Sequence, residues 1–68
     1  MKYYIRKTDK RTGQVEYKRY KCIDGFSENK GLCWQFSKPG ALKIIERLKE
    51  EYRRNINNLT FDLEEVQE

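Results

Sequence analysis

Acidic side chains gather at the C-terminal end of the chain and are the first candidates for chemistry. Residues 58–68 contain Asp62, Glu64, Glu65 and Glu68, with no Lys or Arg. On a strand, alternate residues share one face, so Asp62 and Glu64 could offer carboxylate oxygens to a hard cation. We interpret the cluster instead as a solvated edge and tail, and we predict no metal site.

The other reactive side chains are two thiols, Cys22 and Cys33, in a chain without histidine. Two thiols cannot complete a four-ligand zinc site, and their spacing is not CxxC. The stretch DGFSENKG, residues 24–31, lacks the P-loop pattern. We therefore predict that the protein is not an enzyme and holds no cofactor. We expect reduced thiols packed as small apolar groups, with a disulfide as the alternative.

Positive charge is concentrated at the front of the chain. Residues 1–23 hold eight Lys or Arg against two Asp or Glu, whereas residues 24–57 hold seven against five. Basic side chains neutralise phosphates, and tyrosines can stack on bases. Lys and Arg also keep an exposed sheet soluble, and a basic front can simply attract an acidic tail. The candidate nucleic-acid contacts are Arg6, Lys10, Arg11, Lys18, Arg19 and Lys21.

Aromatic residues outnumber those that a single helix could cover, because the chain has five Tyr, three Phe and one Trp. Tyrosines on an open sheet face are typical of interface anchors, and an edge strand can bind a partner by strand addition. The candidate partner contacts are Tyr4, Tyr17 and Phe26. The leading interpretation is an accessory module that binds an unknown protein partner or itself, and nucleic-acid binding is the alternative.

These side chains need strands to position them. Residues 3–8 and 14–23 are rich in β formers around the loop 9–14, where Gly13 can adopt a positive φ angle, so we predict a hairpin. A second hairpin would lead to residues 32–36, LCWQF. Val15 and Tyr17 differ in parity from Tyr20. Either a bulge near Lys18 and Arg19 changes the parity, or Val15 and Tyr17 lie on the outer face.

The same alternation bears on the two thiols. A register that places Leu32, Trp34 and Phe36 on one face with Tyr20 and Cys22 leaves Cys33 on the opposite face. A register that pairs the cysteines would bring Lys21 beside Trp34, because a slip of one residue turns every side chain over. The hydrophobic pattern therefore favours unpaired cysteines.

A helix and a last strand complete the predicted fold. Ser37 is a good N-cap, Pro39 suits the first turn, and residues 55–58 stop the helix. The apolar stripe of the helix is Ala41, Ile44, Ile45, Leu48 and Tyr52. Leu59, Phe61 and Leu63 then alternate with polar residues, as in a half-buried strand.

The elements follow the order β-β-β-α-β within a single domain, residues 1–68. We predict an α+β fold, with a mainly antiparallel sheet of three to four strands and one helix on one face. The last strand could lie beside the first strand or the third. The predicted core is Ile5, Tyr20, Cys22, Leu32, Trp34, Phe36, Ala41, Ile44, Ile45, Leu48, Phe61 and Leu63.

Two resemblances add a setting. The stretch CWQFSKPGALKIIERL followed by FDLEEV, within residues 33–66, resembles small proteins of bacterial phages and mobile elements, which implies a fold and a genomic origin but no activity. Three strands and a helix joined by FSKPGA are similar to the arm-site DNA-binding domains of phage-type integrases. By that analogy Arg6, Lys18, Arg19 and Lys21 would contact DNA, although this chain adds a final strand and lacks a catalytic domain.

The start of the chain, MKYYIRKTDK, has no apolar run typical of a signal peptide, and no stretch approaches the length of a membrane span. We therefore expect a cytoplasmic protein without membrane contact.

Overall fold

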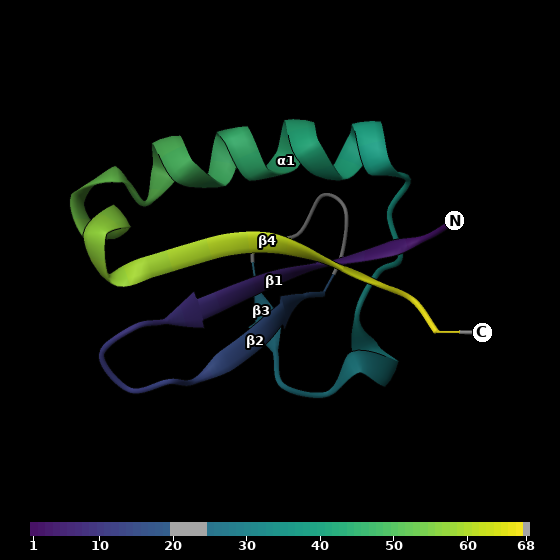
Figure 1. Ribbon diagram of the computed structural model, residues 1–68, viewed down its shortest axis with the longest axis horizontal. Helices are drawn as coiled ribbons and strands as arrows, with labels where there is room; N and C mark the ends of the chain where they lie inside the picture. Colours follow the sequence, from purple (N-terminus) through teal and green to yellow (C-terminus); the bar gives the residue numbers. More distant parts are fainter. Residues whose placement is uncertain (20–24, 68) are drawn as a thin grey trace.

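A four-stranded antiparallel sheet and one α-helix form the part of the chain that the structure describes (Figure 1). This computed structural model describes residues 1–19 and 25–67. The strand order is β3-β2-β1-β4, and α1 packs against β1 and β4. The elements are β1 (Tyr3–Asp9), β2 (Val15–Lys18), β3 (Phe26–Ser27), the 3-10 helix η1 (Lys30–Leu32), α1 (Lys38–Glu51), the 3-10 helix η2 (Arg53–Asn58) and β4 (Leu59–Glu65). The predicted α+β fold is confirmed.

The predicted hairpin of β1 and β2 is present, and its turn depends on Gly13. This residue has a φ of 77°, which an L side chain rarely adopts, and its N–H donates to the Asp9 carbonyl at 2.7 Å. Arg6 lies opposite Tyr17 in the hairpin. Since alternate side chains share a face, Val15 and Tyr17 lie on the face away from the helix, the second of the two alternatives left open.

The last strand lies beside the first. β4 pairs antiparallel with all seven residues of β1, from Tyr3 opposite Glu65 to Asp9 opposite Leu59. The register places Ile5 opposite Leu63. The apolar residues of β1 and β4 therefore lie together under the helix, which explains why the sequence stabilises this pairing.

The helix begins and is patterned as predicted, with Ser37 at the N-cap and Pro39 in the first turn, although the Ser37 side chain makes no cap hydrogen bond. It ends at Glu51, earlier than residues 55–58, because the chain continues as η2. Its buried stripe completes the core, whose members are Ile5, Phe36, Ala41, Ile45, Leu48 and Phe61. Ile44 and Leu63 are partly buried against it. These eight core assignments are confirmed.

The predicted strand over residues 32–36 is wrong. The third strand is β3, and the chain then forms η1 because the Asn29 side chain accepts a hydrogen bond from the Gly31 N–H at 2.9 Å. Among residues 32–36 only Phe36 forms a β-bridge, an isolated one to Tyr3, and the Trp34 backbone N–H makes a single hydrogen bond to the Lys18 carbonyl. Leu32 and Trp34 are therefore not core residues: they are 50% and 47% exposed. Tyr20 and Cys22, also assigned to the core, lie outside the described residues.

Candidate functional site

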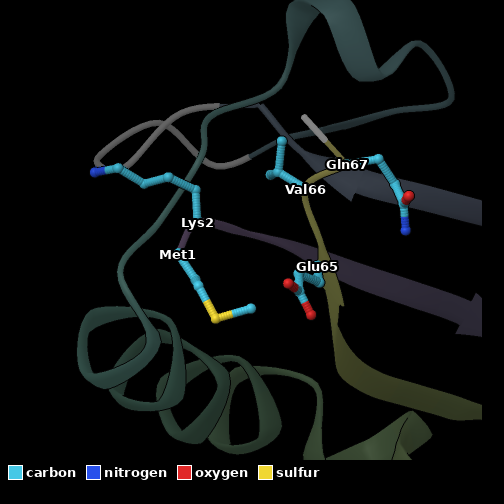
Figure 2. Close-up of a pocket in the computed structure, with 5 residues that line it drawn as sticks. All are labelled: Met1, Lys2, Glu65, Val66 and Gln67. Carbon is cyan, nitrogen blue, oxygen red and sulfur yellow. The ribbon is translucent and has the colours of Figure 1, made fainter.

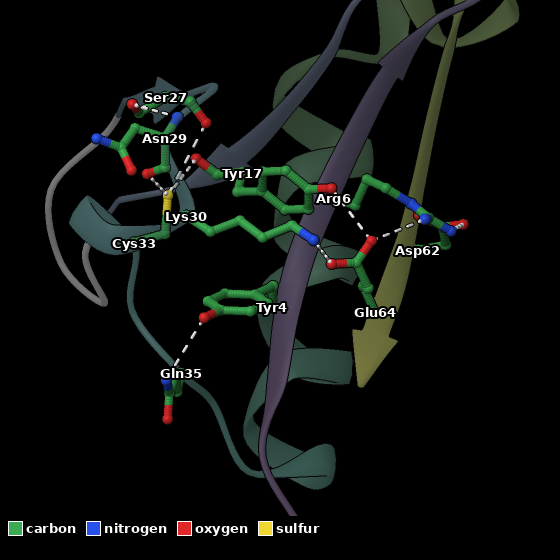
Figure 3. Close-up of polar contacts among 10 residues, drawn as sticks. All are labelled: Tyr4, Arg6, Tyr17, Ser27, Asn29, Lys30, Cys33, Gln35, Asp62 and Glu64. Atoms are coloured by element: carbon green, nitrogen blue, oxygen red, sulfur yellow. Dashed lines mark hydrogen bonds and ion pairs between the residues drawn. The ribbon is translucent and has the colours of Figure 1, made fainter. Parts of the chain in front are cut away.

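The face of the sheet away from the helix, here called the open face, is organised around the Glu64 carboxylate (Figure 3). Arg6 Nη1 donates to its Oε1 at 3.2 Å, and the Tyr17 hydroxyl donates to the same oxygen at 3.1 Å. The Lys30 ammonium forms an ion pair with its other oxygen. One carboxylate thus links β1, β2, η1 and β4.

A second carboxylate fixes the same guanidinium. Arg6 Nε and Nη2 donate to the two oxygens of Asp62 at 2.8 and 2.6 Å, in a bidentate pair between directly opposed residues of β1 and β4. The hydrogen bond to Asp62 raises the pKa of Arg6. The Lys30 ion pair lowers the pKa of Glu64, and Glu64 in turn raises the pKa of Lys30. These contacts favour the ionised forms of Arg6, Glu64 and Lys30.

Two tyrosine rings lie beside this network. Tyr4 and Tyr17 pack edge to face with centroids 5.7 Å apart. Figure 3 shows the extended Lys30 side chain passing both rings on its way to Glu64, with Nζ 5.1 Å from the Tyr17 centroid and 5.9 Å from the Tyr4 centroid. Tyr17 is buried and Tyr4 is half-buried. The structure thus brings Tyr4 and Tyr17, two of the candidate partner contacts, together, but their rings mainly pack against each other and against Lys30 on the open face.

The third partner candidate, Phe26, lies on the helix side. Its ring is 6.5 Å from that of Phe61 and 6.4 Å from that of Tyr52, and it packs against the core. The Lys7 ammonium lies 4.3 Å from the Phe26 centroid and pairs with Glu16 at 3.3 Å. Phe26 therefore closes one end of the core.

The predicted basic face does not form as one surface. Arg6 is on the open face but bound to two carboxylates, and Lys18 is buried on the opposite face with Nζ 5.5 Å from the Phe26 centroid. Lys18 lies opposite Phe26 in the sheet, so the alternation of β2 directs it toward the helix side. Lys10 and Arg11 are exposed in the β1–β2 turn, Arg19 is exposed after β2, and Lys21 lies outside the described residues.

Residues 30–35 form an exposed segment, here called the strap, which carries Leu32 and Trp34. It is held at several points. The backbone N–H of Trp34 donates to the Lys18 carbonyl at 3.3 Å, and the side-chain Nε2 of Gln35 donates to the Tyr4 hydroxyl at 3.5 Å. The ion pair of Lys30 with Glu64 anchors its first residue. The two apolar side chains are thus displayed by a backbone that is fixed to the sheet.

The thiol of Cys33 is one of these anchors. Cys33 is free, and its sulfur lies 3.3 Å from the Asn29 carbonyl and 3.4 Å from the Tyr17 carbonyl. Burial raises the pKa of the thiol, so the neutral S–H, which can donate to these carbonyls, is the form present at neutral pH. The prediction of a reduced, packed thiol is confirmed for Cys33, and Cys22 lies outside the described residues.

Trp34 borders an open hollow of about 350 Å³, which is also lined by Lys2, Cys33 and Gln35. A second open hollow of about 330 Å³ lies where the ends of the chain meet, lined by Met1, Lys2, Glu65, Val66 and Gln67. Figure 2 shows Met1 and Glu65 pointing to the helix side of the sheet and Val66 pointing to the other side.

The alternation of apolar residues in 32–36 places Leu32 and Trp34 in the core, so it does not predict their exposure at the surface. The available signal was the turn composition of residues 28–31, ENKG, which precedes them and favours a tight turn over a strand. Within the described part of the chain, no three His, Cys, Asp or Glu side chains gather as a metal site requires.

Comparison with protein-family models, with curated proteins and with solved structures finds no match to this chain. In residues 1–19 and 25–67, no helix combines the length and the apolar character that a membrane crossing needs.

Proposed function

We propose that this chain is a non-enzymatic accessory module that binds a protein partner through Leu32 and Trp34. The observation that carries the proposal is the exposure of about half of each of these two large apolar side chains, which lie two residues apart on the strap. Tryptophan is the residue type most enriched among energetically dominant interface residues, and it acts by filling a pocket on the partner. The expected partner offers an apolar pocket that receives the indole ring.

The anchoring of the strap supports this role. Its backbone is bonded to β2 through Lys18, its Cys33 thiol lies against backbone carbonyls, and its Lys30 is paired with Glu64. A backbone that is already ordered loses little further conformational entropy when a partner binds, so more of the contact energy appears as affinity. The strap therefore presents Trp34 in a preorganised form.

Nucleic-acid binding through the basic sheet face is the less favoured reading. Its central cation, Arg6, is bound to Asp62 and Glu64, and Lys18 lies on the other face of the sheet. One observation favours a narrower version: Lys2 lines the same hollow as Trp34, so a base stacked on the indole would have a cation nearby for its phosphate.

The test compares two variants of matched exposure. The chain is immobilised, and proteins that it retains from a lysate of the cells that produce it are identified and purified. Each is then titrated against the wild-type chain, Trp34→Ala and Leu42→Ala. Leu42 is 47% exposed, like Trp34, but lies on the helix. We expect Trp34→Ala to weaken binding about 30-fold or more, the loss of a hot-spot residue, and Leu42→Ala to change it less than about threefold.

Three results would count against the proposal. Equal weakening by both substitutions would indicate nonspecific hydrophobic capture, and binding unaffected by Trp34→Ala would place the contact elsewhere. The third result comes from titrating labelled single-stranded DNA into the protein at low and moderate salt. If the protein binds this DNA in a salt-sensitive way and Trp34→Ala abolishes the binding, the indole stacks on bases instead.

A further inference from the structure

The outer edge of β4 has unpaired backbone groups. β4 is the edge strand of the sheet beside β1, and no other described segment pairs with its outer side. The Val66 N–H donates to the Lys2 carbonyl, and the Lys10 N–H donates to the Asn58 carbonyl. Along an antiparallel strand, residues whose backbone groups bond to one neighbouring strand alternate with residues whose groups point to the other side. Because Asn58 and Val66 bond to the chain of β1, the even-numbered residues of β4 do so as well. The N–H and C=O groups of Phe61, Leu63 and Glu65 therefore point outward.

This edge lacks most of the usual protection against strand addition. Natural edge strands are typically short, interrupted by a bulge, or marked by Pro or by charged side chains, especially Lys. β4 has seven residues, contains neither Pro nor Lys, and keeps one register with β1 throughout. The opposite edge, β3, has only two residues. The two edges thus differ, and β4 is the one that offers a template, about 23 Å long at 3.3 Å per residue.

The acidic side chains of β4 do not block the template. Asp62 and Glu64 lie on the open face and are drawn inward, toward Arg6 of the neighbouring strand. The Asp62 side chain is nevertheless 42% exposed, and a carboxylate that accepts two hydrogen bonds retains further lone pairs. A cation on the outer side of Asp62 would occupy the position equivalent to that of Arg6 on the inner side.

We propose that the outer edge of β4 binds one extended segment of a partner protein, with Lys or Arg on its open-face side and apolar residues on its helix side. Main-chain hydrogen bonds to Phe61, Leu63 and Glu65 supply the ladder. The basic residues face Asp62, and the apolar residues pack beside the half-buried Leu63.

A second copy of the chain fits this edge less well. β4 carries three acidic residues and no basic one, so pairing two β4 strands would oppose like charges, which is destabilising. The complementary occupant is therefore a basic strand. The proposal goes beyond binding through Leu32 and Trp34, because it involves a different surface that shares no residue with the strap.

The probe is a capped seven-residue peptide that alternates lysine with valine, and its counterpart alternates glutamate with valine. Each is titrated into the isotope-labelled chain while backbone amide signals and hydrogen exchange are followed by NMR. We expect the lysine peptide to bind at least about tenfold more tightly than the glutamate peptide. It should slow exchange of the Phe61, Leu63 and Glu65 amides about tenfold or more, while the ladder amides of Asp62 and Glu64 are already protected.

A proline variant tests the outer edge of β4 while keeping the pairing of β4 with β1. Glu65→Pro removes one outward donor and leaves the β1–β4 ladder intact, since the Glu65 N–H does not bond to β1. Gln67→Pro makes the same change beyond the end of β4. We expect Glu65→Pro to weaken peptide binding about tenfold or more and Gln67→Pro to leave it within about threefold, with wild-type circular dichroism in both.

Several results would overturn the inference. The first is equal affinity of the chain for the two peptides. The second is that Glu65→Pro binds the lysine peptide as tightly as wild type. The third is that millimolar lysine peptide changes neither the signals nor the exchange rates of the β4 amides. A solution mass of two chains, with the Phe61 amide protected in the absence of peptide, would assign the edge to a second copy. Loss of peptide binding in Trp34→Ala but not in Glu65→Pro would assign the peptide to the strap.

Discussion

Replacing Glu64 by Gln tests how much the open-face network contributes to stability. The Glu64 side chain is 24% exposed and interacts with three donors, from Arg6, Tyr17 and Lys30. Hydrogen bonds to charged groups contribute about 1.5–3 kcal/mol each when they are well buried. Partial exposure reduces this contribution, and the amide oxygen of Gln can still accept one bond. We therefore expect Glu64→Gln to lower the free energy of unfolding by about 2 kcal/mol.

That loss is large for this chain. At about 0.05–0.15 kcal/mol per residue, a domain of this length has a free energy of unfolding of roughly 3–10 kcal/mol. A loss of about 2 kcal/mol should lower Tm by roughly 8–16 °C, measured by circular dichroism with urea denaturation in parallel. Glu65→Gln is the matched control, because it removes the same charge at the exposed neighbouring position. Its effect should stay within about 0.5 kcal/mol.

The pH dependence gives an independent check. The pKa of Glu64 is lowered, chiefly by Lys30, from the ordinary value of 4.5. A carboxylate with a lowered pKa stabilises the folded state above its ordinary pKa, and that contribution is lost as the pH falls through the lowered value. The gap between wild type and Glu64→Gln should therefore be constant near neutrality and shrink below pH 4.5. A gap at neutral pH no larger than that of Glu65→Gln would refute the reasoning.

Three further substitutions test the fold. Ile5→Ala should lower the free energy of unfolding by about 2–5 kcal/mol in urea titrations, because Ile5 is fully buried; a loss under about 1 kcal/mol would contradict that burial. Gly13→Ala should lower the free energy of unfolding by about 1 kcal/mol through backbone strain alone, since a Cβ there meets no atom within 4 Å. An unchanged midpoint of urea unfolding would exclude the positive φ. Trp34→Ala should lower the free energy of unfolding by about 1–2 kcal/mol, because about half of the side chain is buried, whereas a fully buried indole would cost about 3–5 kcal/mol. The half-exposed indole of the wild type should also be quenched by acrylamide.

The elements with a clear local signal were predictable from the sequence. The stripe that includes Ala41, Ile45 and Leu48 matched one helical face, and the alternation of Leu59, Phe61 and Leu63 matched a strand. Local patterning sufficed because each element buries one regular face against a single core.

The segment before the helix could not be predicted in this way. The alternation of Leu32, Trp34 and Phe36 fits a strand, but Asn29 and Gly31 form a local hydrogen bond that directs the chain into η1 instead. A side chain that bonds its neighbouring backbone competes with ladder formation, and no periodicity records that competition.

The network of the open face depends on strand order, which the sequence left open. Attraction between the basic front and the acidic tail was one expected explanation of the charge distribution, and the pairs of Arg6 with Asp62 and Glu64 have that character. Which residues would meet follows only from the register of β1 with β4. Until that register is known, Arg6 fits a phosphate contact equally well.

The position of β4 beside β1 has a consequence for the rate of folding. The contact between Arg6 and Asp62 joins residues 56 positions apart, whereas the β1–β2 hairpin is local. Non-local pairing requires a long loop to close before its contacts form, which slows folding at a given stability. Ile5 gains its full surroundings only when α1 and β4 have both reached β1. We therefore expect the hairpin to form early and the closing of the core around Ile5 to limit the rate of folding.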